Sequence, residues 1–516
     1  MNNILFNADV AVIGAGTMGI GIAQVAAQAG HCVFVYDIAP DAGQKALTAL
    51  SARLNKRVAA GKADASATAE LLARIVPVTT LQALRSCSLV IEAVAERLEI
   101  KQSLFCELEA VCSVETVFAS NTSSLSITAI ASALKHPQRM AGLHFFNPAP
   151  LMKLVEIVRG LETAPEVLAA LRALALHWDK KPVLCCSTPG FIVNRVARPF
   201  YAETLRALEE QIDTPATLDA VLRDAGGFAM GPLQLTDLIG QDVNYAVTES
   251  VFRAFYFDTR FQPSLVQQEL VLAGHLGRKN GRGFYRYDEG SPVVEATFAP
   301  AQTMPLPQQI VLHGDWSSLP GLAQLLSKNA STVMNSGPTS PYACMDKVTF
   351  MLSNGKSATR IAAETGNPVV LFDLSVDYAN ASAIAIGVAR QNEERHNAAV
   401  IALLQSLGKQ VIVLPDYPGL LTLRTVAMLC NEALDVVNKN IASAADTDTA
   451  MCYGVNYPLG PLAWGERLGW QTLLQVMDNL NEFYGEPRYR PMPLLRQLAA
   501  GFTPADFSLS TGDRAA

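Results

Sequence analysis

Residues 10–37 decide the first part of the fold, and they read VAVIGAGTMGIGIAQVAAQAGHCVFVYD. The short segment Asp9–Ile13 is apolar after its first residue and predicts a buried strand. The alanine-rich segment Thr17–Ala29 predicts a helix. A second apolar run, Cys32–Asp37, predicts another strand. Two strands joined through a helix indicate a parallel pair, because a parallel connection needs a crossover segment of about this length.

The turn between the first strand and the helix carries a glycine fingerprint that is typical of dinucleotide binding. Gly14 permits a tight turn, Gly16 lets the backbone approach a pyrophosphate, and Gly19 lets the helix pack closely on the strand. The helix begins at Thr17 and Met18, where free amide groups and the positive end of the helix dipole favour phosphate. The alternative interpretation is that the glycines merely serve a turn.

Asp37 indicates which dinucleotide would bind. It ends the second strand, where a carboxylate accepts hydrogen bonds from the adenine ribose hydroxyls. Ile38 and Ala39 follow, and no adjacent arginine is present to receive a 2′-phosphate. We therefore expect NAD rather than NADP as the cofactor.

Strand and helix patterns alternate up to about residue 189. This alternation predicts a Rossmann-type, doubly wound α/β domain over residues 1–189. Two helices, Pro40–Gly61 and Asp64–Ala73, would project from the sheet as a hairpin. The further expected strands are Leu89–Val94, Thr116–Ala119, Met140–Phe145 and Leu154–Val158.

An all-helical domain is expected over residues 190–290, and it is repeated. Its predicted helices are Phe191–Gln211, Thr217–Ala225 and Thr236–Tyr256. The pattern returns 229 residues later without a gap, which predicts a second, non-catalytic helical domain over residues 418–516. The matches include Pro189-Gly190 with Pro418-Gly419, Arg195 with Arg424, Glu203 with Glu432, Asp219 with Asp448, and Gly231-Pro232-Leu233 with Gly460-Pro461-Leu462.

Strands return between the two helical domains. Residues 291–417 therefore predict a truncated Rossmann-like domain, and no glycine-rich cofactor loop is found in it. Its expected strands are Gln309–Leu312, Lys347–Leu352, Pro368–Leu374, Ala383–Ala389 and Gln410–Leu414.

Composition excludes several classes of protein. With 516 residues, 50% of them hydrophobic, the chain is long enough for several cores. The net charge is −7 and no basic run occurs, so we expect no nucleic-acid or membrane partner. No apolar stretch is long enough to span a membrane, and the N-terminus lacks the features of a secretion signal, so a cytoplasmic location is expected. The nine cysteines are irregularly spaced without CxxC, which predicts neither disulfides nor a metal site.

Two segments carry candidate catalytic residues. If the strands on either side of Pro150 form a hairpin, His144 and Glu156 lie directly opposite each other, and the carboxylate would fix the imidazole tautomer and raise its basicity. The alternative is an ordinary surface pair. Asn121-Thr122-Ser123-Ser124 follows a strand at the carboxyl end of the sheet, where ligands bind, although Ser124 or Ser126 would also serve as a helix cap.

These motifs resemble the 3-hydroxyacyl-CoA dehydrogenase family. The matching segments run in the family's order and cover residues 1–288 densely, while the second helical copy matches more loosely. The long form with two copies resembles the 3-hydroxyadipyl-CoA dehydrogenases of bacterial phenylacetate catabolism. The segments are VIGAGTMG (12–19), SNTSSLSIT (120–128), HFFNPAPLMKLVEIV (144–158), TPGFIVNR (188–195), GPLQLTDLIG (231–240) and GRKNGRGFY (277–285).

The resemblance implies NAD-dependent oxidation of (S)-3-hydroxyacyl-CoA to 3-oxoacyl-CoA, with 3-hydroxyadipyl-CoA and 3-hydroxybutyryl-CoA both open as substrates. It implies that His144 is the base and that Glu156 orients it. Ser123 and Asn194 would then bond the oxygen that becomes the ketone. The positions at which the family contacts NAD are Asp37, Glu96, Lys101, Ser123, Asn147 and Lys279.

The helical hairpin meets CoA in the family. Here it carries four basic residues that would face CoA phosphates or form an ordinary solvated face, and both interpretations stay open. They are Arg53, Lys56, Arg57 and Lys62.

The second half departs from the family pattern. At the same offset of 229, His144 becomes Asp373, Glu156 becomes Ala385 and Asn194 becomes Leu423, which predicts one active site per chain. Relatives dimerise through the helical domain. A homo-oligomer is possible, and we expect the second copy to mimic the dimer partner within one chain.

Two rival functions remain. One is a β-hydroxyacid dehydrogenase that acts on a free acid and uses a lysine. The other is a non-catalytic NAD-binding protein, against which the residue set Ser123, His144, Glu156 and Asn194 argues.

Overall fold

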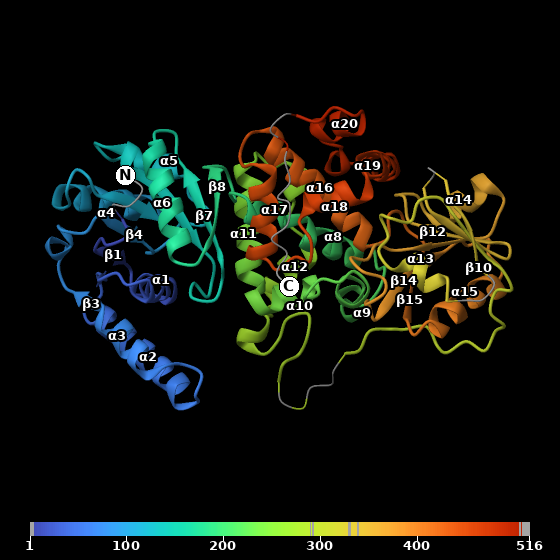
Figure 1. Ribbon diagram of the computed structural model, residues 1–516, viewed down its shortest axis with the longest axis horizontal. Helices are drawn as coiled ribbons and strands as arrows, with labels where there is room; N and C mark the ends of the chain where they lie inside the picture. The colour runs from blue at the N-terminus through green and yellow to red at the C-terminus, as the bar shows by residue number, and fades with distance from the viewer. Residues whose placement is uncertain are drawn as a thin grey trace. The chain divides into compact units, whose positions relative to one another are not determined.

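The computed structural model describes residues 5–288, 290, 294–328, 332–337, 340–504 and 507. The chain forms two compact bodies (Figure 1). The first contains the chain up to Arg195 together with Lys439–Val455, and the second contains Val196–Asn438 and the described residues from Asn456 to Phe507. Within the described residues, no helix has the length and apolar character needed to cross a lipid bilayer.

The first body is built on an eight-stranded sheet in the order β3-β2-β1-β4-β5-β6-β7-β8. All neighbouring strands are parallel except β6 and β7, so the predicted Rossmann-type sheet is confirmed. Strands β3 and β8 were not predicted. The strands are β1 Val10–Ile13, β2 Val33–Tyr36, β3 Ile75–Val78, β4 Leu89–Glu92, β5 Val117–Ser120, β6 Met140–Phe145, β7 Leu154–Arg159 and β8 Lys181–Cys186.

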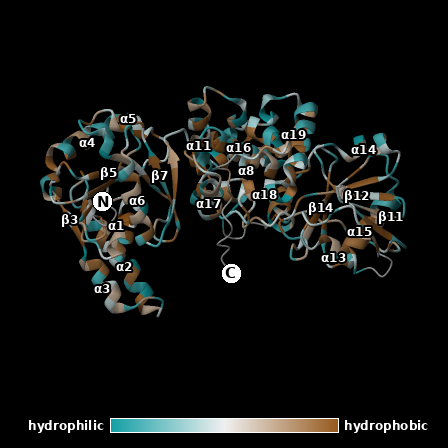
Figure 2. Cartoon of the chain, turned by 45° about the horizontal axis from the view of Figure 1, so that its top comes forward, coloured by the Kyte–Doolittle hydropathy of each residue, from teal (hydrophilic) through white to brown (hydrophobic). Residues whose placement is uncertain are grey.

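The core of the first body lies between this sheet and its helices. Residues of β1 and β4 such as Val12 and Ile91 are fully buried, and Figure 2 shows β7 in the colour of hydrophobic residues. Burial on both faces explains the continuous apolar strands of the sequence. The α-helices of this body are α1 Thr17–Gln28, α2 Ala42–Ala59, α3 Ala65–Ala73, α4 Leu98–Val111, α5 Ile127–Ala131, α6 Pro165–His177, α7 Val193–Val196 and α17 Ala444–Gly454.

Helices α2 and α3 form the predicted hairpin and extend away from the sheet (Figure 1). Asp64 begins α3 as its N-cap, since its side chain accepts a hydrogen bond of 2.8 Å from the backbone N–H of Ala67. The turn between the helices passes through Gly61, whose φ of +67° suits glycine.

The second body contains most of both helical copies. The predicted helix over Thr236–Tyr256 is wrong, because the chain breaks at Gly240 with φ of +105° into α10 and α11. The first copy comprises α8 Arg198–Glu209, α9 Pro215–Ala220, a π-helical turn Val221–Ala225, α10 Pro232–Ile239, α11 Gln241–Ala254 and α12 Leu265–Leu272. The second copy contributes α16 Thr422–Asn438, α18 Pro461–Leu468, α19 Trp470–Tyr484 and α20 Pro493–Ala499.

A second sheet of seven strands also lies in this body, in the order β10-β9-β11-β12-β13-β14-β15. Strands β12 to β15 repeat the pairing of β5 to β8, including one antiparallel pair, β13–β14. Strands β10 and β11 were not predicted. The elements are β9 Ile310–His313, β10 Thr332–Asn335, β11 Tyr342–Met345, β12 Val348–Leu352, β13 Val369–Phe372, β14 Ala383–Val388, β15 Gln410–Leu414, α13 Leu322–Leu326, α14 Ala358–Thr365 and α15 Glu394–Ser406.

The two helical copies contact each other through α8 and α16. Buried polar contacts join them: Arg260 Nη1 lies 2.8 Å from Glu432 Oε2, and the Tyr489 hydroxyl donates to Glu203 Oε2 over 2.8 Å. Arg424 Nε also lies 3.0 Å from Glu203 Oε2. Because residues 260 and 489, and residues 203 and 432, are equivalent at the offset of 229, each copy makes the reciprocal contact to the other.

His31 makes the stability of the first body pH-dependent. Its Nδ1 lies 2.8 Å from the carbonyl oxygen of Ala8, and Trp178 Nε1 donates to its Nε2 over 2.9 Å. Only a neutral ring donates from one nitrogen and accepts at the other. Burial lowers the pKa of His31, so the folded state binds its proton less readily than the unfolded state.

We therefore predict that the His31 contribution to stability is complete above its ordinary pKa of 6.5 and declines as the pH falls below that value. Chemical denaturation at about pH 7.5 and about pH 5.5 measures this loss. His31→Gln removes the pH-dependent part, whereas replacement of the exposed His136 by Gln should not. An equal loss in wild type and His31→Gln would contradict the prediction.

Candidate active site

His144 and Glu156 form a buried pair on the antiparallel strands β6 and β7. The two residues are direct cross-strand partners, as the hairpin register predicts. His144 Nδ1 lies 2.7 Å from Glu156 Oε2, and the side chains are 6% and 0% exposed. A carboxylate at Nδ1 favours the tautomer with its proton there, which leaves the lone pair on Nε2. Nε2 makes no hydrogen bond to the described chain.

The second oxygen of Glu156 is also used. Glu156 Oε1 accepts hydrogen bonds from the backbone N–H groups of Ile192 and Val193, over 3.0 and 2.9 Å. Asn194 is the next residue, within α7, and it is half-buried. The carboxylate thus joins the His144 strand to the segment that carries Asn194.

The loop Asn121–Ser124 lies beside the His144 strand, because Asn121 Oδ1 accepts a 2.8 Å hydrogen bond from the backbone N–H of Phe145. Ser126, not Ser124, caps the following helix, since its hydroxyl accepts from the N–H of Ala129. The Ser123 hydroxyl makes no hydrogen bond with the described part of the chain. It is therefore available to a ligand.

Glu96 holds this loop. Its Oε1 accepts hydrogen bonds from the Thr122 hydroxyl over 2.6 Å and from the backbone N–H of Ser123 over 3.1 Å. Burial opposes ionisation of this carboxyl, but the hydrogen bond from Thr122 and the charge of Lys101 lower the pKa of Glu96.

Lys101 is fully buried under the same loop. Its ammonium lies 2.6 Å from Glu92 Oε1 and 3.2 Å from Glu96 Oε2. Glu92 also accepts a 2.6 Å hydrogen bond from the Ser120 hydroxyl. The resemblance led us to expect that Lys101 contacts NAD, and in the structure its ammonium contacts Glu96. Glu92, the other partner of Lys101, is a site residue that the sequence analysis missed. Its only signal was an acidic residue at the end of an apolar strand.

The glycine loop fits a dinucleotide. Gly14 has φ of +100°, and a Cβ on it would lie 2.5 Å from the carbonyl oxygen of Ala93. A Cβ on Gly19 would lie 1.8 Å from the carbonyl oxygen of Gly14, which explains the close packing of α1 on β1. Gly16 begins α1 as an N-cap without a side-chain hydrogen bond, and the space around its Cα is open. The first N–H groups of the helix, at Thr17 and Met18, are therefore accessible to phosphate.

Asp37 lies at the carboxyl end of β2, beside the glycine loop. Its Oδ2 accepts a hydrogen bond of 2.7 Å from the N–H of Ala15, and its Oδ1 accepts one of 2.9 Å from the N–H of Ala39. Each carboxylate oxygen keeps a lone pair for a ribose hydroxyl. These residues therefore fit NAD.

The other residues predicted to bind the cofactor or CoA are Asn147, Lys279 and four basic residues at α2. Asn147 is exposed just beyond β6. The loop that follows it is tied down by Lys180, whose buried ammonium donates to the carbonyl oxygens of Ala149 and Met152 over 2.6 and 2.8 Å. Burial lowers the pKa of Lys180 to about 8.

Lys279 belongs to the second body, where it pairs with Asp242. The basic residues Arg53, Lys56, Arg57 and Lys62 are exposed on and after α2.

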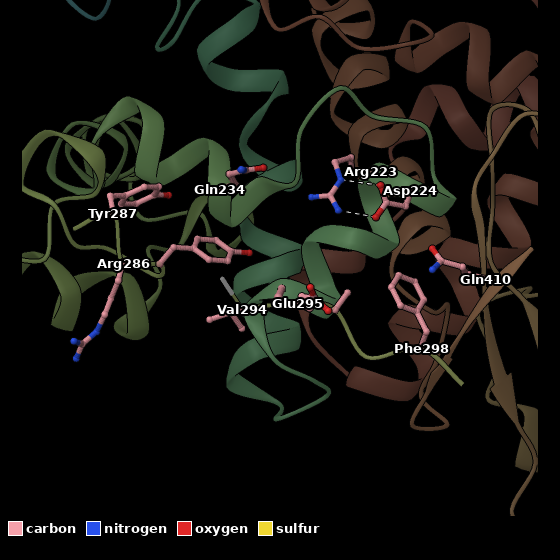
Figure 3. A pocket seen from close by; sticks show the side chains of 12 residues that line it. Arg223, Asp224, Gln234, Arg286, Tyr287, Val294, Glu295, Phe298 and Gln410 are labelled. Carbon is pink, nitrogen blue, oxygen red and sulfur yellow. Dashed lines mark hydrogen bonds and ion pairs between the residues drawn. The ribbon is translucent and has the colours of Figure 1, made fainter. Parts of the chain in front are cut away.

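A cavity of about 490 Å³ lies in the second body (Figure 3). Arg223 and Asp224 line it as an ion pair, together with Gln234, Tyr285 and Phe298. None of the predicted catalytic or cofactor residues lines this cavity. Among the described residues, no group of three or more His, Cys, Asp or Glu side chains is arranged to hold a metal ion.

Comparison with protein families accounts for most of the chain. Residues 9–188 match the "3-hydroxyacyl-CoA dehydrogenase, NAD binding domain". Residues 190–287 and again 419–502 match the "3-hydroxyacyl-CoA dehydrogenase, C-terminal domain", which confirms the predicted duplication. Residues 350–418 match the "3-hydroxybutyryl-CoA dehydrogenase reduced Rossmann-fold domain".

Individual relatives agree with these families. The chain is 50% identical over 490 residues to 3-hydroxyadipyl-CoA dehydrogenase of Escherichia coli K12, covering 95% of this chain and 97% of that protein. A probable 3-hydroxybutyryl-CoA dehydrogenase of Bacillus subtilis is 40% identical over 281 residues, which cover 54% of this chain and 98% of that one. A crystal structure described as 3-hydroxybutyryl-CoA dehydrogenase from Escherichia coli K12 has a TM-score of 0.87 and 49% identity, covering 96% of this chain and 98% of that one.

The dinucleotide loop after β1, the His144–Glu156 pair on β6 and β7 of the same sheet, and the family matches over most of the chain agree with one another. The chain belongs to the 3-hydroxyacyl-CoA dehydrogenase family and is an NAD-dependent oxidoreductase that acts on the hydroxyl group of 3-hydroxyacyl-CoA.

Proposed function

We propose that His144 is the catalytic base of this chain and that it acts on the (S)-3-hydroxyl group of the acyl-CoA. The observation that carries this assignment is the 2.7 Å hydrogen bond from His144 Nδ1 to a fully buried carboxylate, with Nε2 free. Nε2 takes the hydroxyl proton as the alcohol becomes a ketone, and Glu156 stabilises the imidazolium that forms. NAD supplies the acceptor for the hydride that leaves C3.

Ser123 and Asn194 hold the substrate oxygen during this step. The free hydroxyl of Ser123 and its loop beside the His144 strand support this role. Two donors aimed at the oxygen position it for Nε2 and orient the C3 hydrogen. Of the proposed NAD contacts, the glycine loop, Asp37, Glu96 and Asn147 lie on the first body, and Lys279 lies on the second.

The second half of the chain has no equivalent site. Asp373, Ala385 and Leu423 replace the base, its orienting acid and the amide, so we propose a single active site in each chain. The domain boundaries at residues 189, 290 and 417 are proposed from the changes between strand and helix patterns together with the repeat.

We propose 3-hydroxyadipyl-CoA as the preferred substrate, which would assign the enzyme to phenylacetate catabolism. The relative of that name aligns with both helical copies and the second sheet, since it covers 95% of this chain. The short relatives named for 3-hydroxybutyryl-CoA cover about half of it, 54% in the case of the Bacillus subtilis protein. The full-length structure described as a 3-hydroxybutyryl-CoA dehydrogenase makes that thioester the second candidate.

Initial rates of the reverse reaction test the substrate. We expect kcat/KM for 3-oxoadipyl-CoA to exceed that for acetoacetyl-CoA by about 10-fold or more, because a distal carboxylate adds a specific polar contact. A free 3-hydroxy acid should not be turned over. A preference for acetoacetyl-CoA would assign the shorter substrate, and turnover of the free acid would favour the rival dehydrogenase class.

His144→Gln tests the base. We expect kcat to fall by about 10³-fold, because glutamine does not accept the proton. The NAD dissociation constant should stay within about twofold, since the glycine loop is untouched. His136→Gln, at an exposed position, is the matched control and should keep full activity. Turnover near the wild-type rate in His144→Gln would show that another group is the base.

We also infer that the second helical copy acts as the dimer partner of the first. The reciprocal contacts Arg260–Glu432 and Tyr489–Glu203 support this inference, because a two-fold dimer interface makes each contact twice. Sedimentation should therefore detect no dimer assembled through α8. Concentration-dependent hydrogen-exchange protection of α8 in a self-associated species would contradict it.

A further inference from the structure

We propose that the Glu156 carboxylate is a clasp that sets the position of Asn194 as well as the orientation of His144. The catalytic part of this inference rests on the proposed function, while its structural part does not. One buried group would then hold the base from one side and the oxygen-binding amide from the other.

The segment before Asn194 needs such a clasp. Gly190 and Phe191 have φ of +72° and +48°, and a phenylalanine in this left-handed region is strained. The two N–H groups that follow, at Ile192 and Val193, both donate to Glu156 Oε1. All of these residues are in the first body. The turn is therefore held by a charge-assisted contact immediately before the residue that would bind substrate.

The second half of the chain contains the same turn. Gly419 and Leu420 have φ of +81° and +50°, equivalent to the values at Gly190 and Phe191. Asp373 accepts the N–H groups of this turn: Leu421 and Thr422 donate to its Oδ2 over 3.0 and 2.7 Å, and Leu423 donates to its Oδ1 over 2.8 Å.

The carboxylate that accepts the N–H groups of this turn stands on a different strand in each half. In the first sheet it projects from β7 at position 156, opposite a histidine. In the second sheet it projects from the end of β13 at position 373, and Ala385 stands opposite, in the same register. The turn keeps a carboxylate in both halves, although only one half carries the histidine. We infer that the clasp is a requirement of the fold and that Glu156 adds the orientation of His144 to it.

The structural part of the inference, that the carboxylate holds the turn, is tested by introducing the residue types of the second sheet at the equivalent positions of the first sheet. Glu156→Ala removes the clasp and should lower the melting temperature by about 5 °C. The double variant His144→Asp with Glu156→Ala copies Asp373 and Ala385, and it should regain most of that loss. His144→Ala in the Glu156→Ala background is the matched control and should not. If the double variant is no more stable than Glu156→Ala, the clasp is refuted. If Glu156→Ala does not fold, recovery of folding in the double variant supports the clasp and its absence refutes it.

Glu156→Gln separates the two tasks of the side chain. The glutamine oxygen still accepts both N–H groups, but its amide donates to His144 Nδ1 and forces the proton onto Nε2. We expect a melting temperature within about 2 °C of wild type and a fall in kcat of about 10³-fold.

A double-mutant cycle with Asn194 tests the positioning role. With NAD present, Asn194→Ala should weaken acetoacetyl-CoA binding by about 10-fold in the Glu156→Gln background, where the clasp remains. In the Glu156→Ala background it should have an effect of about twofold or less, because Asn194 is already displaced. Equal losses in both backgrounds would overturn the positioning role. Failure of the proposed function appears separately, as turnover by His144→Gln.

Discussion

The geometry of the active site depends on the one antiparallel pair in an otherwise parallel first sheet. A parallel neighbour has to be reached through a long crossover, whereas the β6–β7 hairpin returns the chain within twelve residues and places Glu156 directly opposite His144. Because both strands have a neighbouring strand on each side, the carboxylate is fully buried and has to be satisfied by donors. The imidazole supplies one donor and the turn before α7 supplies two. The catalytic pair and the connection to the helical domain are therefore one hydrogen-bonded unit.

The second half of the chain keeps the parts of this arrangement that the fold requires and lacks the parts that the chemistry requires. Lys409 donates to the carbonyl oxygens of Ala379 and Ala381, as Lys180 does to those of Ala149 and Met152. The glycine loop has no equivalent, and the histidine position holds the clasp residue instead. A buried backbone amide costs free energy in any domain if it is left unpaired, but a base is needed only where substrate binds. This difference explains which contacts survived in the second copy.

The sequence predicted features that depend on neighbouring residues and on simple periodicity. The glycine loop and the repeat at 229 residues were readable from spacing. Spacing placed residues 144 and 156 opposite each other only if a hairpin formed, and the family resemblance favoured this over a surface pair. Strand β3 was missed because Pro77 interrupts its apolar pattern at the edge of the sheet, where a proline is tolerated. The packing of α17 against β7 and β8 joins residues far apart in the chain, and the sequence has no signal for it. The donors of the Glu156 clasp are backbone N–H groups, which every residue except proline carries, so residue types could not reveal them.

The interface between the helical copies shows what fusion into one chain permits. In a dimer of identical subunits, a two-fold interface makes every contact twice, so any substitution changes both sides together. Here the two sides differ: Glu432 meets an arginine at position 260, whereas Glu203 meets a tyrosine at the equivalent position 489. Each glutamate is buried and keeps a donor, which is what burial of a carboxylate demands. Because each contact occurs once in the fused chain, the two halves are free to satisfy that demand with different residues, and the second copy can lose catalytic residues while it still covers the first.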